Sequence, residues 1–251
     1  MQKTLDERPL EFVEETAFGI WFLSTETWYR HVLSRALNDL QRMLEPGQIY
    51  ADILDVGCGR GKSLRLLDER FRPQHIVALE PDAHMLREAE VLGAQCNSRV
   101  TLLRTSATDT QLPGDAFDMV FCHQTFHHIA DQESAMREFY RVLKPGGVLL
   151  FAESTKRYIE SWIIRLLFRH PMEAQKTAGE YIALLRDTGF NLPVEKISLP
   201  YLWWSRGDLG LFEKLGFAPP AKREETLVNA VAIKPACGSL RDPLNNGVKL
   251  C

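Results

Sequence analysis

A glycine-rich stretch between an apolar run and a helical pattern constrains the fold of this chain more than any other feature. It covers residues 53–63 and reads ILDVGCGRGKS. The apolar run Ile53–Val56 predicts a short buried strand, which Gly57, Gly59 and Gly61 follow directly. Glycines at such a place permit positive φ angles and let a ligand approach the backbone, and the N-terminus of the next helix favours an anionic group. The stretch therefore predicts a strand–loop–helix unit that binds a ligand.

Further apolar runs alternate with helical patterns and extend this unit into a sheet. The expected strands are residues 53–56, 75–79, 100–103, 117–122, 148–152, 194–204 and 225–233. Helices are expected over residues 82–92, 134–143 and 177–185, and after the glycine loop. Strands that alternate with helices indicate a parallel sheet covered on both faces. We therefore expect an α/β fold with a mostly parallel seven-stranded sheet.

Segments outside this alternation predict a helical cap. Apolar residues at helical spacing over 25–44 place a helix in an N-terminal cap of residues 1–50, before a main domain of residues 51–234. A helix over 158–168 lies in a first cap insertion at about 156–174, and a second insertion covers about 203–218. The Gly-, Pro- and Asn-rich residues 235–251 predict a flexible C-terminal tail.

Composition and charge exclude several classes of partner. The chain has 251 residues, 45% hydrophobic and 25% charged, with a net charge of −3 and no cluster of Lys and Arg that would follow a phosphate backbone. Nucleic acid is therefore not expected as a partner. No apolar run approaches the ~20 residues that span a bilayer, and the charged N-terminal segment does not resemble a signal peptide. The five cysteines show no disulfide or zinc spacing, so we expect reduced thiols and a cytoplasmic location.

The spacing of the glycines leaves three classes of ligand open. A phosphate loop requires glycine where this chain has Val56, and a dinucleotide loop requires glycine where it has Lys62. Glu80, at the end of the second expected strand, suits a ribose diol in a dinucleotide site and in an S-adenosylmethionine site alike. The pattern disfavours the phosphate and dinucleotide loops, and neighbouring motifs must decide between the ligands.

Four motifs, in order along the chain, resemble those of class I S-adenosylmethionine-dependent methyltransferases. They are DVGCGRG at 55–61, LEPD at 79–82, Leu-Pro at 112–113 with Phe-Asp at 117–118, and EFYRVLKPGG at 138–147. The last motif follows Phe-His-His at 126–128 and is similar to the ubiquinone/menaquinone-biosynthesis group of these enzymes. The resemblance covers about residues 52–153. It implies a Rossmann-like fold, S-adenosylmethionine as the cofactor and S-adenosylhomocysteine as the product.

The same resemblance implies which residues bind the cofactor. The backbone of the glycine loop lies against the methionine part, Asp55 lies near the amino group, and Glu80 accepts the two ribose hydroxyls. The third strand of the family usually ends in Gly-Asp-Ala, and its Asp holds the adenine amino group. Here the matching run is Thr-Ser-Ala at 105–107. The implied cofactor-binding residues are Asp55, Gly57, Cys58, Gly59, Glu80, Pro81, Ser106, Ala107 and His123.

Candidates for the chemistry follow the fourth expected strand, at the carboxyl edge of the sheet where such folds bind ligands. The run at 122–128 reads CHQTFHH. Because histidine titrates near neutrality, His127 and His128 are candidates for a base or a substrate contact, and Gln124 is a candidate substrate contact. The competing interpretation is that these histidines only order the loop. No metal is expected, because no carboxylate or thiol completes a ligand set with them.

We expect an enzyme that transfers a methyl group from S-adenosylmethionine to a small, partly apolar metabolite by in-line displacement. The Asn/Asp-Pro-Pro-aromatic run usual in nucleic-acid methyltransferases is absent after the fourth expected strand, which favours a small methyl acceptor. A non-catalytic S-adenosylmethionine-binding protein of the same fold and a phosphate-loop nucleotide-binding protein stay open as alternatives. The sequence predicts neither the acceptor nor the oligomeric state.

Overall fold

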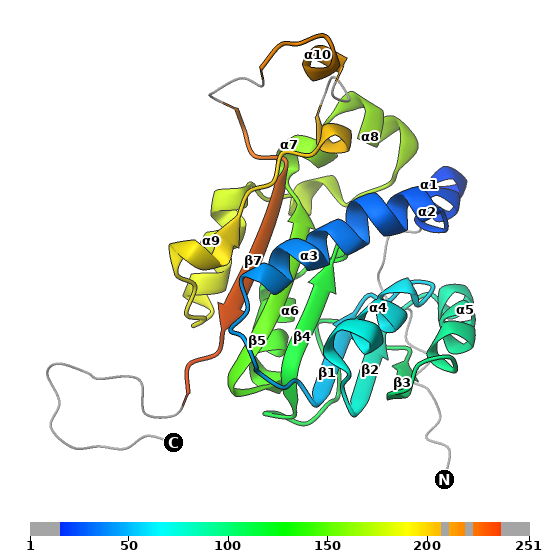
Figure 1. Ribbon diagram of the computed structural model, residues 1–251, viewed down its shortest axis with the longest axis vertical. Helices are drawn as coiled ribbons and strands as arrows, with labels where there is room; N and C mark the ends of the chain where they lie inside the picture. Colours follow the sequence, from blue (N-terminus) through cyan, green and yellow to red (C-terminus); the bar gives the residue numbers. More distant parts are fainter. Residues whose placement is uncertain (1–15, 207–210, 219–222, 237–251) are drawn as a thin grey trace, which may run out of the picture.

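A seven-stranded, mostly parallel sheet forms the centre of the protein (Figure 1). The computed structural model describes residues 16–206, 211–218 and 223–236. Strand order is β3-β2-β1-β4-β5-β7-β6; β1 to β5 run parallel, and β7 is antiparallel to both of its neighbours. The strands are β1 Asp52–Val56, β2 His75–Leu79, β3 Arg99–Leu103, β4 Phe117–His123, β5 Leu143–Ser154, β6 Ile197–Ser198 and β7 Leu227–Ile233. The predicted α/β fold is confirmed.

Helices cover both faces of this sheet. Leucines of α3 and α4 pack in one hydrophobic cluster, and residues of α6 and α9 pack in the other. No helix in the described ranges is both long enough and apolar enough to cross a membrane. The helices are α1 Ala17–Leu23, α2 Glu26–Trp28, α3 Ser34–Arg42, α4 Lys62–Phe71, α5 Ala83–Gly93, α6 Gln132–Val142, α7 Lys156–Ile159, α8 Trp162–Leu167, α9 Ala178–Asp187 and α10 Leu211–Lys214. A π-helical segment, η1 Tyr29–Leu33, joins α2 to α3, and short 3-10 turns are η2 Phe126–His128, η3 Met172–Ala174, η4 Val194–Lys196 and η5 Trp203–Ser205.

The order of the strands creates one crevice at the carboxyl edge of the sheet that suits ligand binding. From β1 the chain proceeds outward through β2 to β3, and then returns to the other side of β1 as β4. The connections that leave the carboxyl ends of β1 and β4 therefore diverge, and a crevice opens between them. The glycine loop follows β1 and the histidine-rich run follows β4, so both lie at this crevice.

The N-terminal segment forms a longer helical unit than the sequence predicts. The expected helix over 25–44 consists of α2, η1 and α3 and ends at Arg42. Its middle is π-helical, because the Ser34 N–H donates to the carbonyl of Tyr29, five residues back. The helix α1, which no periodicity in the sequence indicated, precedes it. Its N-cap residue Thr16 accepts a hydrogen bond from the N–H of Gly19 at 3.0 Å.

Two predictions for the C-terminal half are wrong. The expected strand over 194–204 contains only the two paired residues Ile197 and Ser198, which lie opposite β7. Pro193 and Pro200 flank this pair, and proline has no N–H to donate to a sheet. The expected single helix over 158–168 is two short helices, α7 and α8, separated by residues 160–161.

Other segments lie partly outside the described ranges. Of the tail over 235–251 only residues 235–236 are described, and the insertion over 203–218 lacks residues 207–210.

Gly146 and Gly147, at the end of the motif over residues 138–147, lie within β5 itself. Gly146 has a φ of +82°, and the pairing of β5 with β4 shifts its register between Phe117 and Met119. A Cβ atom on Gly147 would lie 2.8 Å from the carbonyl oxygen of Lys144, so a side chain there requires the backbone to move. The two glycines therefore permit an irregular but continuous strand.

Candidate active site

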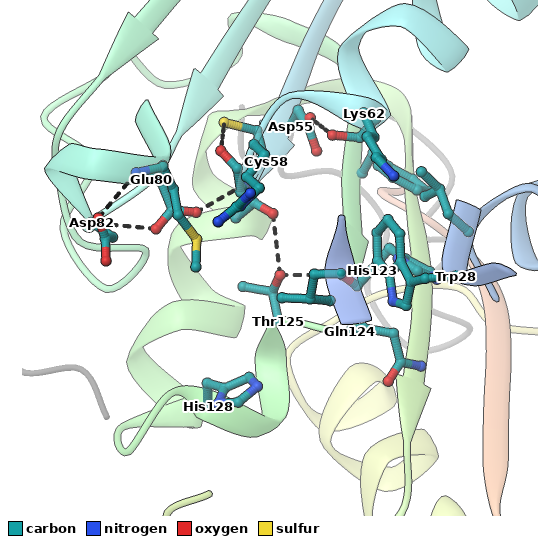
Figure 2. A pocket seen from close by; sticks show the side chains of 18 of the residues that line it. Trp28, Asp55, Cys58, Lys62, Glu80, Asp82, His123, Gln124, Thr125 and His128 are labelled. Atoms are coloured by element: carbon teal, nitrogen blue, oxygen red, sulfur yellow. Dashed lines mark hydrogen bonds between the residues drawn. The ribbon is translucent and has the colours of Figure 1, made fainter. Parts of the chain in front are cut away.

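A cavity of about 330 Å³ lies at the carboxyl ends of β1, β2 and β4, and its size is typical of small-molecule sites. One side, the carboxylate wall, is formed by Asp55, the glycine loop 57–59 and residues 80–82. The opposite side, the cap wall, is formed by side chains of the N-terminal helices, namely Ile20, Leu23, Trp28 and Leu33. Residues 123–125 and His128 line the cavity between the two walls. Figure 2 shows Glu80 and Asp82 on one side of the central space and Trp28 beside His123 on the other.

Most of the site residues that the sequence indicates line this cavity. They are Asp55, Gly57, Cys58, Gly59, Glu80, Pro81, His123, Gln124 and His128. Ser106, Ala107 and His127 do not line it. The hydroxyl of Ser106 instead accepts the N–H of Thr108 at 3.2 Å and lies 2.7 Å from the Thr108 hydroxyl. The adenine contact therefore stays a prediction.

The glycine loop is shaped by two close backbone approaches. Gly57 has a φ of +74°, and a Cβ atom there would lie 2.3 Å from the side chain of Thr125, at the end of β4. Gly61 has a φ of +86°, and a Cβ atom there would lie 2.9 Å from Cα of Ala89 in α5. Gly57 thus brings the loop against the end of β4, whereas Gly61 brings α4 against α5.

Asp55 and Glu80 place two buried carboxyl groups on the carboxylate wall. Asp55 is 1% exposed and accepts a hydrogen bond from the Ser63 hydroxyl at 2.6 Å. Glu80 is 7% exposed, and its two oxygens accept the N–H groups of Gly59 at 2.9 Å and Asp82 at 3.0 Å. These bonds hold each carboxyl group in one orientation. None of the three donors is a cation.

Burial disfavours the charged form of both carboxyl groups. It raises the pKa of Asp55 to about 7, opposed by the Ser63 hydrogen bond and aided by the negative charge of Glu80. It also raises the pKa of Glu80 to about 7, against the two backbone N–H groups, which favour the carboxylate. A cation placed between these groups would restore their ionised forms. The wall therefore suits a ligand that carries positive charge together with hydroxyl donors.

S-adenosylmethionine has these properties, and the residues present fit it. Its sulfonium and ammonium groups are the positive charges that the wall lacks, and the carboxylate of Glu80 keeps lone pairs for two ribose hydroxyls. The open backbone at Gly59, where a Cβ atom would meet nothing within 4 Å, leaves room beside the loop. The carboxylate wall therefore fits this cofactor, and Asp55, Glu80 and the glycine loop are the residues that would hold it.

The end of β4 brings polar side chains to the cavity in a constrained backbone. Gln124 has a φ of +51°, a conformation that is uncommon for residues other than glycine and is often found at functional sites. Its side-chain oxygen accepts the Ser154 hydroxyl at 2.6 Å. His123 stacks on Phe121 and meets the edge of Trp28, and its Nε2 has no hydrogen-bond partner in the described part of the chain. Burial lowers the pKa of His123 to about 3, so this imidazole is neutral near pH 7.

His127 has a different role in the fold from its neighbour His128. Its Nδ1 lies 2.6 Å from Oε2 of Glu153, and both side chains are buried. The other oxygen of Glu153 accepts the backbone N–H groups of Thr125 and Phe126. Glu153, which the sequence did not single out, therefore orders the loop after β4. His128 reaches the cavity, but burial lowers its pKa well below the usual value, which makes it a weak proton acceptor.

The sequence also missed the residues of the cap wall as site residues. Lys62, the first residue of α4, links this wall to the core, because its ammonium group donates to the carbonyls of Ser24 and Thr25 at 2.7 and 3.0 Å. Apolar spacing indicates that residues 25–44 are helical. It carries no information on which strand ends the helices cover.

Comparison with known proteins agrees with this geometry. Residues 54–151 match the family model described as a methyltransferase domain. Residues 54–151 therefore resemble a methyltransferase domain, and the sheet around them has the Rossmann-like fold of class I methyltransferases.

Particular relatives differ in their methyl acceptors. The chain is 30% identical over 142 residues to phosphoethanolamine N-methyltransferase 1 of Arabidopsis thaliana, and this match covers 55% of this chain and 27% of that protein. It is 29% identical over 126 residues to demethylmenaquinone methyltransferase of Listeria monocytogenes, and this second match covers 48% of this chain and 53% of that protein. The chain thus spans between about a quarter and about half of these relatives.

Solved structures extend the likeness beyond the core. The plantazolicin methyltransferase BamL, in complex with S-adenosylhomocysteine and a substrate analogue, matches with a TM-score of 0.62 over 87% of this chain and 89% of its own. The two sequences are 15% identical, so this likeness shows the fold alone.

Proposed function

We propose that this protein is an enzyme that transfers the methyl group of S-adenosylmethionine to a small, partly apolar metabolite. The observation that carries the proposal is the pair of buried carboxyl groups, Asp55 and Glu80, which line the same cavity beside a left-handed glycine turn. Among the residues that the structure describes, neither group has a cationic partner. The match of residues 54–151 to the methyltransferase domain supports the same conclusion. The runs at 126–128 and 138–147, with the match to demethylmenaquinone methyltransferase, support placing the protein in the ubiquinone/menaquinone-biosynthesis group.

The chain's contribution to such a reaction is to position the reactants. When bound, S-adenosylmethionine supplies an activated methyl group, which an acceptor atom takes in line as the carbon–sulfur bond breaks. Glu80 would hold the ribose, and Asp55 would hold the positively charged amino group. The protein then determines the rate mainly by the orientation of the acceptor and by the exclusion of water.

The cap wall supports an acceptor with an apolar part. Ile20, Leu23, Leu33 and Trp28 give this side of the cavity aliphatic and aromatic surface. Its polar groups come from the end of β4, where His123 and Gln124 are the candidate contacts and His128 lies nearby. Because His123 and His128 are neutral and weakly basic, the arrangement favours an acceptor that needs no strong base.

Calorimetric titration with S-adenosylhomocysteine tests the cofactor part of the proposal. We expect one binding site, and we expect Glu80→Gln to weaken binding about 10- to 100-fold, because a hydrogen bond to a charged group contributes about 1.5–3 kcal/mol. Glu90→Gln, at an exposed position of α5, is the matched control and should change nothing. If the wild type does not bind, or if both variants bind like the wild type, the cofactor assignment is wrong.

Transfer of label from methyl-labelled S-adenosylmethionine tests the enzymatic part. Incubation with a fractionated metabolite extract should label a compound of low molecular mass that partitions partly into organic solvent. Binding of S-adenosylhomocysteine without any labelled product would support the non-catalytic alternative instead. Label recovered only in macromolecules would contradict the small-molecule acceptor.

A further inference from the structure

Three imidazole side chains from two distant segments meet beside the cavity. His127 and His128 lie in η2, after β4, whereas His170 lies between α8 and η3. One candidate ligand nitrogen from each lies within 4.8 Å of the other two. The ring centroids are 4.3 Å apart for His127 and His128, 4.8 Å for His128 and His170, and 5.0 Å for His127 and His170. His170 is therefore more than forty positions away in the sequence from the two adjacent histidines that it meets.

The nitrogens of this group are available as ligands. The Nδ1 of His127 is engaged at 2.6 Å by the buried carboxylate of Glu153, which leaves Nε2 with a free lone pair. Glu153 is itself held by two backbone N–H groups, so the ring of His127 is fixed in orientation. A carboxylate behind a histidine is the usual arrangement around a bound metal, because it sets the tautomer and increases the basicity of the ligand.

His128 and His170 have no competing partners for their ring nitrogens. Within the described ranges, no hydrogen bond reaches either imidazole. Their ring nitrogens are therefore available to a cation, which imidazole binds through the lone pair of its neutral form.

We propose that His127, His128 and His170 bind one divalent first-row transition cation of the zinc class, with Glu153 as the carboxylate that orients His127. Neutral imidazoles suit Zn²⁺, Cu²⁺, Fe²⁺ and Ni²⁺ better than Mg²⁺ or Ca²⁺. In a tetrahedral zinc site the ligand nitrogens lie about 3.4 Å apart, so the nitrogens must approach one another by up to about 1.4 Å when the cation binds. The side chains of His128 and His170 are only partly buried, which leaves them room for this change.

The cation has two consequences in this fold. It joins η2 of the core to the segment after α8, and this segment contacts the N-terminal cap, where the ring of Phe168 meets those of Phe18 and Phe22. Three protein ligands also leave a fourth position for water or for a ligand atom, as in catalytic zinc sites. His128 lines the cavity, so that position is reachable from it. The site would therefore hold the cap closed at the acceptor side.

Titration of the 251-residue chain with Co²⁺ and Zn²⁺, after removal of metal with a chelator and dialysis, tests this proposal. We expect one equivalent of Co²⁺ to give visible d–d absorption that one equivalent of Zn²⁺ abolishes. His170→Ala and His128→Ala should each weaken Zn²⁺ binding at least tenfold, and Glu153→Gln should weaken it 10- to 100-fold. His84→Ala removes an exposed histidine of α5 and is the matched control, which should bind like the wild type.

Further readouts separate a metal site from a packing role and from failure to fold. Zn²⁺ should slow amide hydrogen exchange in residues 160–174 of the wild type but not of His170→Ala, whose circular dichroism should match the wild type. Absence of a stoichiometric Co²⁺ spectrum, or Zn²⁺ affinity unchanged in His170→Ala, overturns the proposal. A thiolate-to-cobalt charge-transfer band also overturns it, because the ligands are then cysteines. These measurements need no methyl acceptor and no cofactor, so they stand apart from the tests of the proposed function.

Discussion

The carboxylate wall and the cap wall of the cavity differ in how their parts are assembled. On the carboxylate wall, Asp55, the glycine loop and Glu80 belong to one strand–helix–strand unit of 29 residues, from 52 to 80. Backbone N–H groups hold Glu80 in place. On the cap wall, apolar side chains from residues 20–33 cover strand ends that come much later in the chain. The first wall is rigid because its contacts are local and bonded to the main chain. The second depends on contacts between separate segments, and so it is the part that can vary with the acceptor.

The largest expected difference between the walls is in their response to pH. The native pKa of Asp55 is about 7, against a usual value of 3.8, so the folded protein keeps a proton that the unfolded chain releases between about pH 4 and pH 7. The free energy of unfolding should therefore fall as pH rises through this window, by up to about 4 kcal/mol relative to Asp55→Asn. Urea denaturation of both proteins at several pH values, without ligand, measures this.

Saturating S-adenosylhomocysteine should reduce this pH dependence, because its ammonium group stabilises the carboxylate of Asp55. Parallel stability curves for the wild type and Asp55→Asn across this window would show that Asp55 is ionised in the native protein. That result would remove the electrostatic distinction between the walls.

A second test concerns the close approach of the glycine loop to the end of β4. Gly57→Ala places a Cβ atom 2.3 Å from the side chain of Thr125, whereas Gly59→Ala meets nothing within 4 Å, although both glycines have positive φ. We expect Gly57→Ala to be about 1–3 kcal/mol less stable than Gly59→Ala, which is the usual cost of overpacking. Thermal or urea unfolding measures the difference.

The double variant Gly57→Ala/Thr125→Gly provides the check on this cause. Because Thr125→Gly removes the atoms that the new Cβ would meet, the double variant should recover part of the loss relative to Thr125→Gly alone. If it recovers none, the strain comes from the backbone conformation and not from the contact between the loop and β4.

A smaller effect is expected where the cap wall joins the core. Lys62→Met removes the two hydrogen bonds from the ammonium group to the carbonyls of Ser24 and Thr25, at a cost of about 1 kcal/mol in stability. Amide exchange should become faster in residues 17–33 and stay unchanged in β1 and β2. Arg65→Ala, on the same helix, removes an exposed ion pair with Glu69 and is the control. Equal exchange in both variants would mean that Lys62 does not hold the cap.

The smallest effect is expected for Arg157, at the start of the first cap insertion. Arg157 is 66% exposed and pairs with Glu224, which is 75% exposed, at 3.4 Å. Because solvent screens such pairs, Arg157→Ala should change the unfolding free energy by less than about 0.5 kcal/mol. It should also leave the affinity for S-adenosylhomocysteine unchanged. A clear loss of acceptor turnover in this variant would instead give Arg157 the role of binding an acidic group of the acceptor.

Local patterns determined the parallel core of the protein and most of the carboxylate wall. Strand and helix periodicities, and glycines that require positive φ, depend on residues near each other in the chain, and so the sequence predicts β1 to β5 and places Asp55 and Glu80 at strand ends. The same reasoning failed at residues 194–204, where Pro193 and Pro200 flank a segment at the sheet edge that pairs over two residues only.

Only the tertiary structure decided which distant side chains meet. Packing of α1 and α2 over the strand ends brought Trp28 to His123, and the buried Glu153 of β5 oriented His127. The segment after α8 then brought His170 to both histidines of η2. These contacts join residues that lie between 26 and 95 positions apart. They arise from the way hydrophobic faces stack, and no spacing within the sequence encodes them. The sequence by itself therefore determined the carboxylate wall, to which we assign the cofactor, and tertiary packing decided which side chains face that wall.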